Sequence, residues 1–111
     1  MGLLLILAVG PKIDKFSIQD KQVQEGVNVG IMCILTEGDS PVTFQWTKDG
    51  QLASSLSGVH VVTPNEYSSL LSISGSTMTH RGNYTCLASN PVASDAHTTQ
   101  IHLNGNLEKC A

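Results

Sequence analysis

The sequence is short of aromatic residues, of basic charge and of long apolar runs. It has one Trp, two Tyr and two Phe among 111 residues, and its six Lys and Arg are outnumbered by nine Asp and Glu. A net charge of −3 gives no indication of the basic surface on which electrostatic nucleic-acid binding depends. The longest apolar run, Leu3 to Val9, is too short for a transmembrane helix. The length allows one domain.

Sequence motifs of catalysis and metal binding are missing as well. No serine lies in a nucleophile-elbow motif, and the histidines do not follow a metal-ligand spacing. His97 and His102 are five residues apart, so on a strand they would point to opposite faces. His80 is expected to serve a structural corner. We therefore expect no enzyme activity, no cofactor and no metal site.

Two cysteines, one tryptophan and one tyrosine carry the strongest signal. Trp46 follows Cys33 by thirteen positions, and Tyr84 lies two positions before Cys86. In a β-sandwich, a disulfide bridges the inner faces of two sheets, a large aromatic residue covers it, and a tyrosine hydroxyl ties down a sheet corner. The spacing predicts an all-β, immunoglobulin-type two-sheet sandwich with a Cys33–Cys86 bridge. Such a bridge persists in an oxidising compartment, which predicts an extracellular domain.

Short alternating segments separated by Gly, Pro, Asn and Asp agree with this fold. The predicted strands are 11–16 (A) with its continuation 21–25, 27–35 (B), 42–48 (C), 59–63 (D), 68–74 (E), 83–89 (F) and 97–103 (G). The segment 52–57 has only a weak pattern. In strand B, the inward face is expected to hold Val27, Val29, Ile31, Cys33 and Leu35.

The opposite face of strands B, D and E carries more apolar side chains than a solvated face needs. Met32, Ile34 and Leu70 are expected to point outward, and Val62 from strand D to join them. Several such residues on adjacent strands indicate an interface, whereas single exposed apolar residues do not. Cover by a neighbouring domain or loop is the alternative, and a one-residue register error would turn the whole set inward.

Three further features are a tripeptide at the start of the strand 83–89 and the two ends of the sequence. Asn83-Tyr84-Thr85 is an N-glycosylation tripeptide, and Asn83 points outward if Tyr84 points inward. Residues 1–10 are expected to be a hydrophobic leader, a remnant of a preceding segment or an added stretch; they resemble the apolar part of a secretory signal but lack a basic start. Residues 104–111 are expected to be a linker or tail, and the third cysteine, Cys110, lies there. The domain itself is predicted to span 11–103.

Three stretches support a narrower comparison. They are Pro11 to Phe16, Glu66 to Ile73, and His80 to Asn90. Together with the Cys–Trp–Cys spacing, they resemble an I-set immunoglobulin domain of the arthropod Down syndrome cell adhesion molecule (Dscam) family. Most I-set domains have Asp where this chain has His80, and histidine at this position is familiar in that family. The chain resembles either the variable seventh domain of the insect protein or the first domain of the shortened chelicerate forms.

The resemblance implies a function in self-recognition between cells. Domains of this family come from alternatively spliced, single-pass membrane proteins and bind identical copies of themselves through the sheet of strands A, B, E and D (the ABED sheet), in an antiparallel two-fold dimer. The expected interface residues are Met32, Ile34, His60, Val62, Leu70 and Ser72. The other expected partner is a neighbouring immunoglobulin domain of the full-length protein.

Two other functions remain open at this point. One is heterophilic binding of a ligand or microbial surface, as in an immune receptor. The other is a spacer module of the kind found in cytosolic muscle proteins, which would keep Cys33 and Cys86 reduced.

Overall fold

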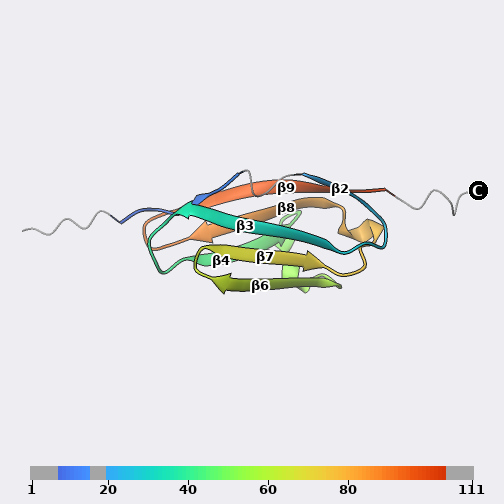
Figure 1. Ribbon diagram of the computed structural model, residues 1–111, viewed down its shortest axis with the longest axis horizontal. Coiled ribbons are helices and arrows are strands. Elements are labelled where there is room, and N and C mark those ends of the chain that lie inside the picture. Colours follow the sequence, from blue (N-terminus) through green and yellow to red (C-terminus); the bar gives the residue numbers. More distant parts are fainter. Residues whose placement is uncertain (1–7, 16–19, 105–111) are drawn as a thin grey trace, which may run out of the picture.

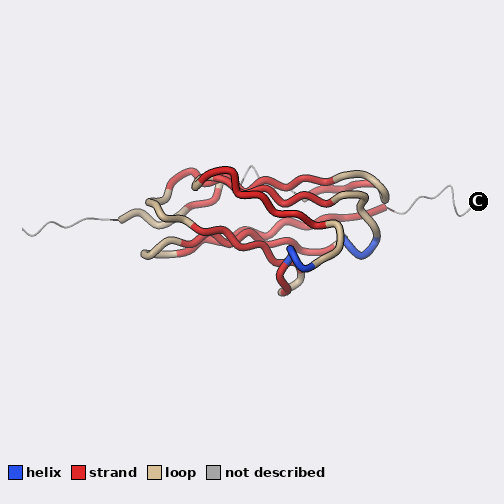
Figure 2. The backbone as a smooth tube through the Cα atoms, turned by 90° about the horizontal axis from the view of Figure 1, so that it is seen from below, coloured by secondary structure: helices blue, strands red, loops and turns tan. Residues whose placement is uncertain are grey.

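The computed structural model describes residues 8–15 and 20–104, which fold into two facing β-sheets (Figures 1 and 2). The first sheet, in the order β1-β3-β7-β6, consists of β1 (Lys12–Ile13), β3 (Val29–Glu37), β7 (Ser68–Ile73) and β6 (Val59–Asn65). The second sheet, in the order β2-β9-β8-β4-β5, consists of β2 (Lys21–Gln24), β9 (Ser94–Asn104), β8 (Gly82–Ser89), β4 (Thr43–Lys48) and β5 (Gln51–Leu52). Two short 3₁₀ helices, η1 (Ala53–Ser55) and η2 (Met78–His80), complete the described elements. The predicted two-sheet fold is confirmed, and the predicted ABED sheet is β1-β3-β7-β6.

Most strand boundaries differ from the prediction by one or more residues, and three of the differences are larger in consequence. Strand β3 begins at Val29, and Val27 is 41% exposed, so the prediction that Val27 points inward is wrong. Its carbonyl accepts a hydrogen bond from the Ser76 amide, which holds Val27 directly after the turn at Glu25 and Gly26. Strand β9 starts at Ser94, earlier than predicted, because it pairs with β8 as far as Ser89.

The third difference concerns the segment 52–57, which is better ordered than its sequence pattern indicates. Leu52 pairs with Thr47 at the edge of the second sheet, and η1 follows directly. The Ala53 side chain in this helix is completely buried. A single small buried residue gives no periodic signal, which explains why the pattern missed it.

The core lies between the two sheets and follows from the alternation of side chains along the strands. Its buried hydrophobic residues are Ile13, Val29, Ile31, Cys33, Leu35, Trp46, Ala53, Val59, Leu71, Ile73, Tyr84, Cys86, Ala88, Ile101 and Leu103. Val23, Val42, Phe44, Leu56 and Met78 are half-buried and pack against them. The register of β3 is therefore as predicted from Val29 onward.

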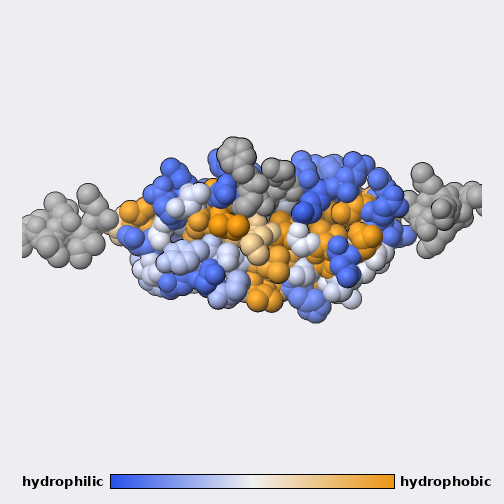
Figure 3. Space-filling view, viewed as in Figure 1, coloured by the Kyte–Doolittle hydropathy of each residue, from blue (hydrophilic) through white to orange (hydrophobic). Residues whose placement is uncertain are grey.

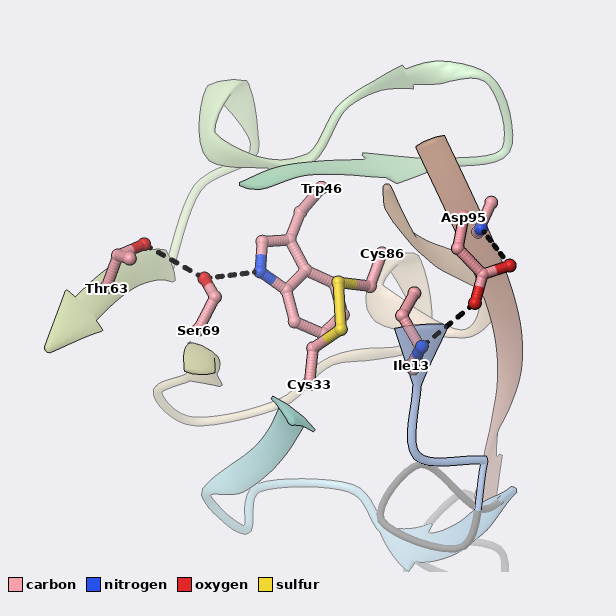
Figure 4. The surroundings of a disulfide bond; sticks show 8 residues. Ile13, Cys33, Trp46, Thr63, Ser69, Cys86 and Asp95 are labelled. Atoms are coloured by element: carbon pink, nitrogen blue, oxygen red, sulfur yellow. Dashed lines mark hydrogen bonds between the residues drawn. A yellow bond between two sulfur atoms is a disulfide. The ribbon is translucent and has the colours of Figure 1, made fainter. Parts of the chain in front are cut away.

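A disulfide between Cys33 and Cys86 joins the two sheets at the centre of the core (Figure 4). Trp46 packs beside it and is directly opposite Cys86 in the β4–β8 ladder. The indole Nε1 donates a 2.9 Å hydrogen bond to Ser69 Oγ, which lies opposite Cys33 in the β3–β7 ladder. Ser69 Oγ also lies 3.1 Å from Thr63 Oγ1. The buried tryptophan thus has a polar partner, which burial of its N–H requires.

Removal of the bridge should lower stability mainly by freeing the unfolded chain. The disulfide closes a loop with a sequence separation of 53. We expect the double variant Cys33→Ala/Cys86→Ala to lose about 4 kcal/mol of unfolding free energy, as loop-closure entropy predicts. Urea titration of both proteins in a Cys110→Ser background measures this loss without interference from the third thiol. An unchanged denaturation midpoint would contradict this account of the core.

Candidate functional site

The outer face of β3, β7 and β6 carries a row of apolar side chains. Met32 lies opposite Leu70 in the β3–β7 ladder, and Leu70 lies opposite Val62 in the β7–β6 ladder. Directly paired residues on one face of a sheet have neighbouring side chains. Met32 is 38% exposed and Val62 54% exposed, while Leu70 between them is half-buried. Three strands that are distant in the sequence therefore build one continuous apolar row.

The next row on the same face is flatter and more polar. Gly30, Ser72 and His60 are paired across the same three strands. A side-chain carbon placed on Gly30 would lie 3.7 Å from Leu70 Cδ1, so the bare backbone of Gly30 leaves room beside the leucine. Ile34, two positions beyond Met32, is half-buried.

We call these side chains the β3–β7–β6 patch: Met32, Ile34, His60, Val62, Leu70 and Ser72. Apolar residues gather along the middle of this face, with polar residues around them (Figure 3). The structure thus brings together all six residues predicted for the interface, and the predicted outward register is found.

Formal charge lies at the border of this face. Lys12 and Glu37 form a 3.7 Å ion pair on the β1 edge, and both side chains are largely exposed. Within the patch, His60 is the one ionisable side chain. An interface with an uncharged centre can lose water without leaving a buried unpaired charge, which would be costly.

The outer face of the second sheet has a different character. Gln45, Thr98, Gln100 and His102 are exposed there, and Thr98 Oγ1 lies 2.7 Å from Thr85 Oγ1. The polar side chains on this face can form hydrogen bonds with one another, as Thr85 and Thr98 do, or with solvent. The two outer faces of the sandwich are therefore chemically distinct.

His80 occupies the corner that leads into β8 and is buried. Its Nδ1 accepts a hydrogen bond from the Thr77 amide at 2.9 Å, which caps η2. Because Nδ1 acts as the acceptor, Nε2 carries the proton and donates to the Ser57 carbonyl at 2.7 Å. Both ring nitrogens are thus used by the backbone. The corner position predicted for His80 is found, and its ring is committed to structure.

Tyr84 completes the corner as predicted. Its ring is fully buried, and its hydroxyl donates a 2.5 Å hydrogen bond to the His80 carbonyl. Burial, and secondarily the negative charge of Asp49, raise the pKa of Tyr84 to about 12. The Asp49 carboxylate accepts hydrogen bonds from the Asn83 amide and from Lys48, and these lower its own pKa.

Asn90 directly follows β8 and has a structural role that the sequence pattern did not predict. Its Oδ1 accepts hydrogen bonds from the amides of Val92 and Ala93, each at 3.0 Å. Its Nδ2 donates to the carbonyls of Val9 at 2.7 Å and Asp39 at 3.0 Å. One amide thus ties together three segments at the end of the domain where the described chain enters (Figure 1).

The same end holds the entering segment through Asp39. Its carboxylate accepts the Val9 amide at 2.7 Å, and its own amide donates to the Val9 carbonyl at 2.9 Å. Fixation of Val9 by two loops gives the entering chain a defined direction. The signal that could have revealed this was one Asp or Asn residue in each of the two loops, Asp39 and Asn90.

The remaining predicted features are placed as follows. Asn83 is exposed on β8, whereas Cys110 and Leu3 to Leu7 lie outside the described residues. His97 is half-buried and His102 exposed, on opposite faces of β9 as predicted. In residues 8–15 and 20–104, no group of three or more His, Cys, Asp or Glu side chains could hold a metal ion. No helix among these residues is long and apolar enough to cross a membrane.

The family model for the immunoglobulin domain matches residues 11–90. The chain belongs to the immunoglobulin-domain family. It is 38% identical over 86% of its length to the cell adhesion molecule Dscam2 of Drosophila melanogaster, and 38% identical over 84% to the cell adhesion molecule DSCAML1 of Mus musculus. The chain spans about 4% of the length of these relatives. The predicted resemblance to the Dscam family is confirmed.

Solved structures agree with this assignment. The crystal structure of the Dscam1 Ig7 domain, isoform 5, superposes with a TM-score of 0.79 at 28% identity and covers 86% of this chain and 97% of that one. A chimeric titin Z1Z2 gives a TM-score of 0.82 over 91% of this chain and all of that one, but at 20% identity it shows the fold alone. The fly and mouse relatives are equally similar, so the narrower arthropod origin and the choice between first and seventh domain stay predictions.

Raised pH should lower the stability of this immunoglobulin domain through Tyr84. The pKa of this hydroxyl is raised on folding, so its contribution to stability is complete below about pH 10 and is lost as pH rises toward about 12. We expect the unfolding free energy to fall by about 1.4 kcal/mol per pH unit in this window. Urea titrations between pH 8 and pH 12 measure the slope. The variant Tyr84→Phe should be less stable at pH 8 and show a flatter slope, and an equal slope in both proteins would contradict the assignment.

Loss of the Asn90 amide should loosen the entry end of the domain. We expect Asn90→Ala to lower the unfolding free energy by about 2 kcal/mol, because four hydrogen bonds, each of modest net strength, disappear together. Hydrogen exchange at the Asp39 amide, which is bonded to the Val9 carbonyl, should speed up in the same variant. Val92→Ser is a matched control, since that side chain is 55% exposed. Exchange equal to that of the unmodified domain would contradict the proposed linkage.

Proposed function

We propose that this domain is a cell-adhesion module that binds an identical copy of itself through the β3–β7–β6 patch. The observation that carries the proposal is the exposed apolar row of Met32, Leu70 and Val62 across three strands. The row lies on a face whose centre has no carboxylate or ammonium group. Similarity to cell adhesion molecules, among them Dscam2, supports the same function.

A two-fold axis is the simplest way for one patch to recognise itself. In such a contact each residue meets its partner position twice, so one self-complementary surface suffices. We propose an antiparallel arrangement, in which strand β7 of one copy crosses β7 of the other near Leu70. A change at one residue is thereby duplicated, and this duplication lets small sequence differences between splice variants exclude non-identical partners.

The contact between two single domains should be weak. One sheet face offers at most the standard interface of about 1,600 Å² in total. Adhesion would then require many copies on apposed membranes acting together, since linked contacts gain affinity without new surface. This fits a module in the extracellular part of a single-pass membrane protein, where neighbouring immunoglobulin domains align the patches.

The alternatives receive less support from the described residues. A spacer of the cytosolic muscle type would keep its cysteines reduced, whereas Cys33 and Cys86 form a disulfide here. The likeness to titin shows only the shared fold. Heterophilic binding would use the same exposed surfaces, and a direct binding assay distinguishes it from self-recognition.

Charges placed in the patch should abolish self-association without unfolding the domain. We expect Ile34→Asp and Leu70→Lys each to weaken dimerisation at least tenfold, because like charges that meet across a desolvated two-fold contact cost several kcal/mol. Analytical ultracentrifugation measures the dissociation constant, and circular dichroism verifies the fold. Mixing the two variants should restore part of the pairing if the two positions face each other.

Two controls separate the patch from other surfaces and from general destabilisation. Gln45→Lys adds a charge to the exposed face of the second sheet and should dimerise normally. His80→Ala removes the corner bonds and should lower the unfolding free energy while self-association persists. Dimerisation of both patch variants at the unmodified strength would refute the proposed surface. Beads coated with self and non-self variants then distinguish homophilic from heterophilic binding, since only like-coated beads should aggregate with each other.

A further inference from the structure

Asn83 is the one asparagine of the sequence that lies in an Asn-x-Ser/Thr tripeptide. It stands at the start of β8, directly before the buried Tyr84, so its side chain points out of the second sheet. Its backbone is already held: the amide donates to Asp49 Oδ1 at 3.0 Å, and the carbonyl accepts from the Asp49 amide at 2.9 Å. The side-chain amide makes no hydrogen bond with the described part of the chain. Asn83 is therefore free to carry a modification without loss of structure.

The surface beside Asn83 is polar and slightly hollowed. Gln100 is its partner in the β8–β9 ladder. A groove of about 430 Å³ next to it has Gln22, Arg81, Gln100, His102 and Asn104 among its lining residues. Amide, imidazole and guanidinium groups of this kind are hydrogen-bonding partners for sugar hydroxyls. A sugar attached beside these polar groups would therefore not have to displace or cover a buried apolar surface.

We propose that Asn83 carries an N-linked glycan, which makes the outer face of the β2-β9-β8-β4-β5 sheet the shielded side of the domain. The inference rests on the proposed function in one respect: the two sheets lie back to back, so the glycan projects away from the β3–β7–β6 patch (Figure 2). Pairing through the patch is then compatible with the glycan, and pairing through the second sheet is blocked. The modification thus selects which of the two faces is available to a second copy.

The donor required for this step is a lipid-linked oligosaccharide diphosphate. Asn83 Nδ2 forms a bond to the anomeric carbon of the first N-acetylglucosamine, the bond from that carbon to the diphosphate oxygen breaks, and the amide nitrogen gives up one proton. The lipid diphosphate leaves. No oxidant or reductant takes part, and Thr85 supplies the hydroxyl that the tripeptide requires.

The first experiment tests occupancy of Asn83. The domain is secreted from animal cells, and the peptide that contains Asn83 is analysed by mass spectrometry before and after enzymatic glycan removal. Wild type and Thr85→Ser, which keeps the tripeptide, should carry the glycan. Asn83→Gln and Thr85→Val, which destroy it, should not. An unmodified Asn83 in the folded secreted wild type would overturn the inference and leave the proposed self-binding untouched.

The second experiment tests which face is shielded. Ultracentrifugation should give the same dimerisation constant for glycosylated wild type and for Asn83→Gln. Ser72→Asn creates a new Asn-x-Ser tripeptide with Ser74 in the patch, so its glycosylated form should be monomeric. Ser72→Asn/Ser74→Ala has the same substitution without the tripeptide, and the glycosylated variant should dimerise far more weakly than this control.

The possible failures are distinguishable. If the glycan at Asn83 weakens dimerisation, the second sheet takes part in pairing, and the shielded-face inference is wrong. If glycosylated Ser72→Asn still dimerises, the β3–β7–β6 patch is not the contact. That result would refute the proposed function while leaving occupancy of Asn83 intact.

Discussion

The contact between the Cys33–Cys86 disulfide and Trp46 is the constraint on which the rest of the domain depends. It fixes β3 against β8 at the centre of the core, and the bond from the indole to Ser69 Oγ extends this link to β7. Once these strands are fixed, every second residue on each strand must face outward. The outer surfaces are therefore a direct consequence of how the core is joined.

The sandwich turns one chain into a molecule with two unlike faces. On β3, β7 and β6, the outward positions hold Met32, Leu70 and Val62 in one row. The outward positions of β8 and β9 are mostly polar, and Leu87 and Ala96 form one apolar pair among them. A face that can lose water suits contact with another protein, and a face that keeps its water suits a glycan. Both roles are possible in one small domain because the sheets lie back to back.

The described chain is held firmly where it enters the domain. The described chain enters at one end and leaves at the other (Figure 1). At the entry end, Asn90 and Asp39 hold Val9 in place. Such fixation suits a module that works within a row of domains, because the orientation of its neighbour decides where its faces point.

The sequence by itself determined the fold, the disulfide, the corner tyrosine and the outward register of β3, because spacing and alternation are local properties of a chain. The hydrogen bond from the Trp46 indole to Ser69 and the four hydrogen bonds of Asn90 depend on the tertiary structure, which alone decided them. The tertiary structure also decided that Met32, Leu70 and Val62 lie side by side, whereas the sequence pattern predicted only that they point to the same face. Register between strands far apart in sequence depends on how turns and core packing set each strand along its neighbour, and a single-strand pattern does not contain that information.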